Sequence, residues 1–322
     1  MERPIGPEER LRVVIVGTGR VGSSTAYAAL IGGLATEIVL VDADPQRAEG
    51  EAMDLMHGLP YVRPTSVRAG GFADCATADV VIMTAGAARQ PGDTRLDLSR
   101  RNLQLFADLV PRVATSDFTG VLLVVSNPVD LLTLAAQRLS GLPRERVLGT
   151  GTTLDTARMR ALLAQHFGIA ARNVHSYVIG EHGESEVPVW SLARIANLSL
   201  EEFARATGRP WDEEHQRATA EQVRTAGAEV IRRKGATHYA IGLATVAVTR
   251  AILRDERTIL TVGSALAGEQ GLTDVALSVP CLIGRAGRLA TIPLSLSAAE
   301  ESELTRSAGI LRTAYREAGG PA

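Results

Sequence analysis

Cysteine, lysine and aromatic residues are all scarce in this chain. Only two cysteines occur among its 322 residues, and aromatic side chains make up 4% of the total. Cys75 and Cys281 stand in apolar surroundings without the spacing of a metal site or a redox pair, so we expect both to be packing residues. The low cysteine content argues against a disulfide scaffold and against a cysteine-based zinc site, and we expect no bound metal.

An excess of charge of either sign is missing as well. The formal net charge is −2, from 34 basic and 36 acidic residues, which gives no basic surface for nucleic acid. No apolar run is long enough to span a membrane, and the polar N-terminus lacks the apolar core of a secretion signal. We therefore expect a cytoplasmic protein that binds neither nucleic acid nor membranes.

The chain does have enough apolar sequence for a large core. It is 45% hydrophobic and 22% charged, and its length predicts two domains. We place them at residues 1–149, for a dinucleotide, and at residues 150–322, for a substrate and the catalytic groups.

A glycine-rich turn follows the first apolar run. Leu11 to Val16 is short, β-branched and continuously apolar, which is typical of a buried strand. It leads directly into Gly17-Thr18-Gly19-Arg20-Val21-Gly22 and then into a helical pattern. Such a turn lays backbone N–H groups and a helix N-terminus against a pyrophosphate, so the segment predicts a dinucleotide site.

An acidic residue ends the second apolar run. Glu37 to Val41 reads as a strand, and Asp42 follows it, twenty residues after Gly22. A carboxylate there accepts hydrogen bonds from the adenosine ribose and repels a 2′-phosphate, which favours NAD over NADP. The alternative is that Asp42 only caps the helix after Pro45.

Strands and helices then continue to alternate. Apolar runs at 78–83 and 121–125 predict strands, and residues 98–115 and 129–139 predict helices. This alternation predicts a doubly wound parallel sheet with ligands at the carboxyl ends of its strands. Asn127 should then face the nicotinamide end of the cofactor, or simply cap the helix that follows it.

Three further stretches carry charged side chains. The loop Ala87 to Arg95 contains Pro and Gly and two arginines six residues apart, Arg89 and Arg95, so it is either a substrate lid or a solvated loop. His182 lies in a glycine turn after the strand-like residues 176–179. Asp155 and Arg158 share one helical face, either as an intrahelical pair or with separate partners: His182 for the acid and a substrate carboxylate for the arginine.

Taken together, these motifs resemble the L-lactate/L-malate dehydrogenase family over nearly the full length of the chain. The matching segments are Gly17 to Gly22, Asp42, Thr84 to Ala87, Pro91 to Leu98, Ser126 to Asp130, Gly149 to Arg158, Gly180 to Trp190 and Lys234 to Thr237. The resemblance implies a Rossmann NAD domain followed by a mixed α+β substrate domain, with NAD as cofactor and a keto or hydroxy acid as substrate.

The resemblance also implies roles for single residues. His182 corresponds to the proton donor and acceptor, Asp155 to the carboxylate that orients it, and Arg95 to the lid arginine that polarises the reacting carbonyl. Arg158 corresponds to the residue that binds the substrate carboxylate, and Thr237 and Asn127 to residues of the substrate pocket. The cofactor-binding positions are Gly17, Gly19, Val21, Gly22, Asp42, Thr84, Ala85, Gly86, Ser126 and Asn127.

The lid sequence does not decide between oxaloacetate/L-malate and pyruvate/L-lactate as the substrate pair. Malate enzymes of the family carry arginine six residues before the lid arginine, where lactate enzymes carry glutamine, and this chain has Arg89 there with Gln90 one place later. A desolvated arginine without a second carboxylate would cost roughly 3–5 kcal/mol. The segments 149–153, 180–190 and 234–237 are nevertheless lactate-type. We expect a lactate-dehydrogenase-like enzyme with oxaloacetate/L-malate activity, and the alternative is an ordinary L-lactate dehydrogenase.

Regulation and assembly follow from the resemblance alone. Arg160 and His175 match positions that bind fructose 1,6-bisphosphate between subunits in allosteric bacterial lactate dehydrogenases; otherwise they are a surface arginine and a strand-start histidine. The family implies a homotetramer, or a homodimer if malate character extends to assembly.

Two other classes of NAD-binding protein fit the sequence less well. A short-chain dehydrogenase needs a tyrosine four residues before a lysine, but the one lysine, Lys234, follows Val230 at that spacing. An NAD-binding protein without catalysis would have no need of the combined His182, Asp155, Arg95 and Arg158.

Overall fold

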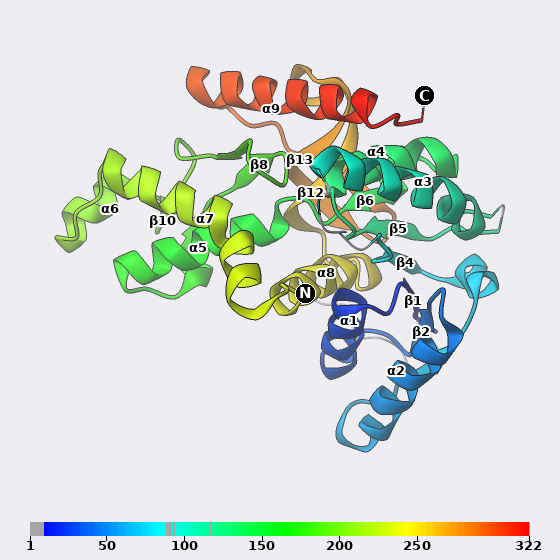
Figure 1. Cartoon of the computed structure of the whole chain (residues 1–322). Helices are drawn as coiled ribbons and strands as arrows, with labels where there is room; N and C mark the ends of the chain where they lie inside the picture. Colours follow the sequence, from blue (N-terminus) through cyan, green and yellow to red (C-terminus); the bar gives the residue numbers. More distant parts are fainter. Residues whose placement is uncertain (1–9, 88–91, 93, 116, 322) are drawn as a thin grey trace.

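The computed structural model describes residues 10–87, 92, 94–115 and 117–321. Within these ranges, one large sheet runs through the molecule in the order β3-β2-β1-β4-β5-β6-β12-β13-β8-β9, with β14 paired to β13. Figure 1 shows the N-terminal strands and helix α2 at one end of the fold and the C-terminal helix α9 at the opposite side. The N-terminal half therefore builds one end of the sheet, and the C-terminal half extends it.

Six strands of the first half are parallel, and their order is that of the predicted doubly wound Rossmann sheet. The strands are β1 (Arg12–Val16), β2 (Glu37–Val41), β3 (Ser66–Ala69), β4 (Val80–Met83), β5 (Val121–Val124) and β6 (Val147–Gly149). The helices between them are α1 (Arg20–Ile31), α2 (Pro45–His57), α3 (Arg95–Val113) and α4 (Val129–Ser140). Because β1 pairs with both β2 and β4, the strand order reverses at β1, and ligands of such sheets bind beside that point.

The second half is mixed, as expected. Its strands in the large sheet are antiparallel: β8 (Val178–Gly180), β9 (Glu186–Pro188), β12 (Thr258–Ala267), β13 (Thr273–Gly284) and β14 (Gly287–Thr291). A smaller sheet holds β7 (Val174–His175), β10 (Arg194–Ile195) and β11 (Leu198–Ser199). The helices are α5 (Thr153–Phe167), α6 (Leu200–Thr207), α7 (Glu213–Lys234), α8 (Tyr239–Leu253) and α9 (Ala298–Glu317).

The core explains why the parallel strands read as continuous apolar runs. All residues of β1, β2, β4 and β5 are buried, because helices cover both faces of the parallel sheet. Both cysteines are buried and unpaired, as packing residues should be. No helix in the described ranges is both long enough and apolar enough to cross a membrane.

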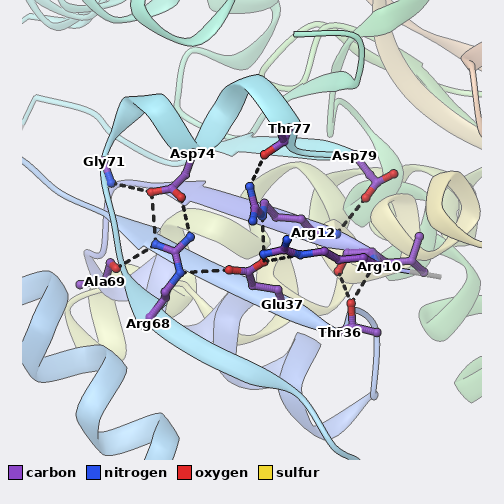
Figure 2. A network of polar contacts seen from close by, with 11 residues as sticks. Arg10, Arg12, Thr36, Glu37, Arg68, Ala69, Gly71, Asp74, Thr77 and Asp79 are labelled. Carbon is purple, nitrogen blue, oxygen red and sulfur yellow. Dashed lines mark hydrogen bonds and ion pairs between the residues drawn. The ribbon is translucent and has the colours of Figure 1, made fainter. Parts of the chain in front are cut away.

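A charged network holds the amino ends of β1 and β2, at the edge opposite to the expected ligand site (Figure 2). The carboxylate of Glu37, whose side chain is 8% exposed, accepts hydrogen bonds from Arg10, Arg12 and Arg68 at 2.7–3.1 Å. Arg68 also pairs with Asp74. Burial acts to raise the pKa of Glu37, but the bonds from the three arginines outweigh it, and the net shift is downward.

We expect Glu37→Gln to lower the free energy of unfolding by about 3 kcal/mol, because it leaves the buried Arg12 guanidinium without its counter-charge. Urea unfolding at pH 7 measures this loss. Because the pKa of Glu37 is lowered in the folded state, its carboxylate stabilises the fold at pH values above the usual pKa of 4.5. This stabilisation is lost as the pH falls through the folded-state pKa. Glu229→Gln is the control, since that acid pairs with two arginines on the surface. An equal loss in both variants would contradict the account.

Candidate active site

A cavity of about 890 Å³ lies where the carboxyl ends of the parallel strands meet the second half of the chain. Six of the predicted catalytic and substrate-binding residues line it: Arg95, Asn127, Asp155, Arg158, His182 and Thr237. They come from five separate parts of the sequence. The fold thus brings the predicted substrate-binding and catalytic groups together, and Val21 of the glycine turn lines the same cavity.

The glycine turn between β1 and α1 has no room for side chains at two of its glycines. Gly17 has a φ of +100°, and a Cβ there would lie 2.5 Å from the amide nitrogen of Ala85. A Cβ on Gly22 would lie 1.9 Å from the carbonyl oxygen of Gly17. Gly19 caps α1 without a side-chain bond, and a Cβ there would meet nothing within 4 Å. The turn is therefore packed on the protein side and open at Gly19, which fits a pyrophosphate against the start of α1.

Asp42 closes this turn from the end of β2. Its Oδ2 accepts hydrogen bonds from the amide and the hydroxyl of Thr18, at 2.6 and 2.8 Å. Burial acts to raise the pKa of Asp42, but the bonds from Thr18 and Asp44 outweigh it and lower the pKa, so the group is ionised at neutral pH. The alternative role of Asp42 as a helix cap is wrong, because Asp44 caps α2 with bonds to Gln46 and Arg47.

The loops after β4 and β5 are fixed by their own hydroxyl groups. Thr84 donates to the carbonyl of Gly17 at 2.6 Å, and Ser126 donates to the carbonyl of Ala85 at 2.5 Å. Gly86 lies between them, and a Cβ at this position would lie at ordinary contact distances from Asn102 and Ser126. The predicted cofactor positions thus lie together, and two of their side chains hold the loops in place.

Asn102 of α3 was not predicted from the sequence, although it organises this region. Its side chain is buried, accepts from the amide of Ala87 at 2.7 Å and donates to the carbonyl of Asn127 at 2.8 Å. Asn127 itself is exposed, lines the cavity and accepts from the amide of Val129 at 3.2 Å. Both interpretations of Asn127, ligand contact and helix cap, are therefore compatible with its position.

His182 and Asp155 form the closest charged contact in the cavity. His182 lies just after β8, beyond Gly180 with its φ of +85°, and Asp155 lies in the first turn of α5. The imidazole Nδ1 is 2.5 Å from Oδ2 of Asp155, which is 1% exposed. Burial acts to lower the pKa of His182, but the charge and hydrogen bond of Asp155 and the charge of Asp130 outweigh it and raise the pKa to about 9.

Arg158 shares the same carboxylate. Its guanidinium donates to Oδ1 of Asp155 at 2.7 Å while Oδ2 faces His182. The sequence allowed two interpretations of Asp155 and Arg158, an intrahelical pair or separate partners. The structure combines them, because Asp155 contacts both Arg158 and His182. The Arg158 side chain is 19% exposed and lines the cavity, so a substrate carboxylate can reach it.

Arg95 begins α3 at the rim of the cavity. Its side chain is 77% exposed and pairs with Glu184 at 2.7 Å, so it lies outside the His182–Asp155 pair in this conformation. The other arginine of the predicted lid, Arg89, and its neighbour Gln90 lie outside the described residues.

The predicted effector residues lie away from the cavity lining. Arg160 donates twice to the carbonyl of Ser176, at 3.1 and 3.0 Å, and burial lowers its pKa. His175 is exposed on β7, one residue before Ser176. The two side chains come from neighbouring segments, with the arginine already hydrogen-bonded within the chain.

Two buried acids beside His182 were also missed as site residues. Asp130 is 3% exposed and Glu186 is 5% exposed, and burial is the largest cause that raises the pKa of each. In the sequence Asp130 stands between the apolar Val129 and Leu131, and that pattern was the available signal; Glu186 follows Glu184 and Ser185 and carries no such signal.

The arrangement suits proton transfer next to a bound carboxylate. A charged imidazole can give a proton, a half-buried guanidinium can bind a carboxylate, and the glycine turn can hold a dinucleotide beside them. Among the described residues, no group of three or more His, Cys, Asp or Glu side chains is placed to hold a metal ion.

Comparison with known proteins agrees with this geometry. The family model for the lactate/malate dehydrogenase NAD binding domain matches residues 11–149, and that for the alpha/beta C-terminal domain matches residues 152–319. The L-lactate dehydrogenase of Synechococcus sp. is 49% identical over 298 residues, which cover 92% of this chain and 96% of that protein. L-lactate dehydrogenase 1 of Clostridium acetobutylicum is 45% identical over 305 residues, covering 95% of this chain and 97% of that protein. The minor L-lactate dehydrogenase from Enterococcus mundtii, solved in its ligands-bound form, superposes with a TM-score of 0.92 at 40% identity, covering 95% of this chain and 98% of that one.

Proposed function

The chain belongs to the lactate/malate dehydrogenase family, and from that premise we propose that it is an NAD-dependent L-lactate dehydrogenase that interconverts pyruvate and L-lactate. The first half matches an NAD-binding domain, and the open side of its glycine turn fits the dinucleotide. NAD, when bound, supplies the hydride in one direction and accepts it in the other. The observation that carries the proposal is the imidazole of His182 at 2.5 Å from Asp155, with Arg158 on the same carboxylate.

In this proposal the protein's own groups handle the carboxylate and the proton. Arg158 binds the substrate carboxylate through its planar guanidinium. His182 then gives its proton to the carbonyl oxygen, and Asp155 stabilises the charged ring before transfer. Arg95 moves over the site when the lid closes and offsets the negative charge that develops on the oxygen. Reduction of the keto acid needs charged His182, and oxidation of the hydroxy acid needs the neutral ring.

Pyruvate is the substrate that the relatives support. Each of the two curated relatives above is named an L-lactate dehydrogenase. The lactate-type segments around Thr150, His182 and Thr237 agree with those names. We therefore propose the pyruvate/L-lactate alternative, and dominant oxaloacetate/L-malate activity becomes the second candidate. One observation favours that second candidate: Arg89 lies six residues before Arg95, which is the malate-type position if the lid has no gap.

Initial rates of NADH oxidation with pyruvate and with oxaloacetate test the choice. We expect a higher kcat/KM with pyruvate. If Arg89 enters the closed site, Arg89→Gln should lower kcat/KM for oxaloacetate by about a hundredfold and raise kcat/KM for pyruvate, because the desolvated guanidinium without a partner is removed. If Arg89 stays outside the closed site, both values should stay within a few-fold. A preference of the unmodified enzyme for oxaloacetate would overturn the pyruvate assignment.

Adding fructose 1,6-bisphosphate at sub-saturating pyruvate tests the proposed effector residues, Arg160 and His175. An unchanged rate would refute that site.

A homotetramer, located in the cytoplasm, completes the proposal. Large apolar side chains stand exposed on two neighbouring helices: Tyr27 and Ile31 on α1, and Tyr239 and Leu243 on α8, each at least 59% exposed. Exposed apolar side chains gathered in this way are typical of subunit contacts. Light scattering of the purified protein measures the number of subunits.

A further inference from the structure

Asp130 is a buried carboxylate that the proposed proton transfer does not use. It lies in the first turn of α4 and is 3% exposed. Its Oδ2 accepts a hydrogen bond from the backbone N–H of His182 at 2.7 Å. The partners are 52 residues apart in sequence, so the bond joins α4 of the NAD-binding half to the turn that carries the imidazole.

The second oxygen of Asp130 has no hydrogen-bond partner among the described residues. It faces Gly263 of β12, where a Cβ would lie 3.3 Å from it. A buried carboxylate with a free oxygen is unfavourable, and burial raises the pKa of Asp130 to about 7. An asparagine would accept the same backbone bond without that penalty. The backbone bond alone therefore does not explain why this position carries a negative charge.

The position of Asp130 links two parts of the cavity. Asn127, three residues before it, lines the cavity at the expected nicotinamide end. α4 packs against β12 and β13, and β13 pairs with β8 at Gly180, just before His182. A short bond from α4 to His182 thus fixes the imidazole backbone relative to the loop that faces the cofactor.

The charges around the ring explain why a second acid is useful. Asp155 faces the imidazole, but Arg158 draws on the same carboxylate and acts to lower the pKa of His182. Asp130 acts in the opposite sense and favours the charged ring. Glu181 and Asp155 face Asp130 as further acids, and Glu186 also interacts with His182. His182 is therefore the one cation among these neighbours of Asp130.

We propose that Asp130 is a positioning residue that acts through His182, holding its backbone against the cofactor side of the cavity and stabilising its charged form. The inference rests on the proposed proton role of His182. It assigns to Asp130 no contact with the substrate.

The test is the pH dependence of kcat/KM for pyruvate reduction in Asp130→Asn, which keeps the shape and removes the charge. We expect the fall in rate at high pH to move down by about one pH unit, so that the rate at pH 9 is roughly fivefold lower while the rate at pH 7 changes little. Glu300→Gln is the matched control, because Glu300 is 6% exposed and likewise accepts a backbone bond, from Ser191 at 3.0 Å. Its profile should equal that of the unmodified enzyme.

Asp130→Ala removes the acceptor as well as the charge. We expect kcat to fall about tenfold at pH 7 with little change in KM, because the imidazole loses its fixed position. If this variant fails to fold, Asp130→Asn decides alone. The proposal is overturned if Asp130→Asn keeps the profile of the unmodified enzyme.

A second readout separates this proposal from the proposed function. The ring signals of His182, assigned by their loss in His182→Gln, can be titrated by NMR without substrate. A lower pKa of His182 in Asp130→Asn supports the charge role even if neither pyruvate nor oxaloacetate is reduced, an outcome that would refute only the proposed function. An unchanged pKa of His182 would refute the inference about Asp130.

Discussion

Replacing His182 by glutamine is expected to lower kcat for pyruvate reduction by about 10²–10⁴-fold. Glutamine keeps a polar side chain of similar length, but it cannot carry a proton that it then gives to the carbonyl oxygen. The loss should appear in kcat at every pH, since no other described side chain in the cavity combines a titrating imidazole with a carboxylate at 2.5 Å. NADH absorbance gives the rate, and NADH fluorescence shows whether the dinucleotide still binds.

His215→Gln is the control for that experiment. His215 also pairs with an aspartate, Asp212, at 2.7 Å, but the pair lies at the surface of α7. We expect its kcat to match that of the unmodified enzyme. Retention of more than a tenth of the activity by His182→Gln would remove the imidazole from the chemistry.

The second large effect concerns Arg95. We expect Arg95→Gln to lower kcat by about 10²–10³-fold, the usual loss when one group that stabilises a developing oxyanion is removed. NADH binding should be unchanged, because the arginine lies at the rim, where it pairs with Glu184. The effect therefore requires that the arginine leaves Glu184 and enters the closed site.

Arg100→Gln on the same helix is the matched control. Arg100 donates to the carbonyl of Glu317 and is exposed, so its loss should not change kcat. An Arg95→Gln enzyme with normal kcat and a raised KM would mean that Arg95 only helps to bind the substrate. That result would refute its role at the carbonyl oxygen.

The parallel half of the fold could be predicted because its signals are local. Each strand is a short apolar run that is buried on both faces, and the turn Gly17 to Gly22 has backbone positions where side chains do not fit. The helix predicted over residues 129–139 is also confirmed closely, since α4 spans Val129–Ser140. The short strands of two or three residues, such as β7 and β10, were missed because so few residues carry no periodic pattern.

The site was predicted in its members but only partly in its contacts. The resemblance named His182, Asp155 and Arg158, and the cavity brings them together. Sharing of one carboxylate by two cations depends on the approach of β8 to α5, which sequence spacing does not encode. Asp130 and Asn102 were missed for the same reason, because their partners are distant in sequence and their role is visible only once those segments meet.

The central claim is that a charged imidazole, stabilised by Asp155, gives the proton to the keto acid. The most direct measurement is the pH dependence of kcat/KM in both directions. The pKa of His182 is raised to about 9, so pyruvate reduction should be constant below that pH and fall above it, while L-lactate oxidation should rise through the same midpoint. Asp155→Asn should move both midpoints down together. If both directions changed with pH in the same sense, or if Asp155→Asn left the midpoints in place, the paired His182 and Asp155 would not be the proton-transferring group.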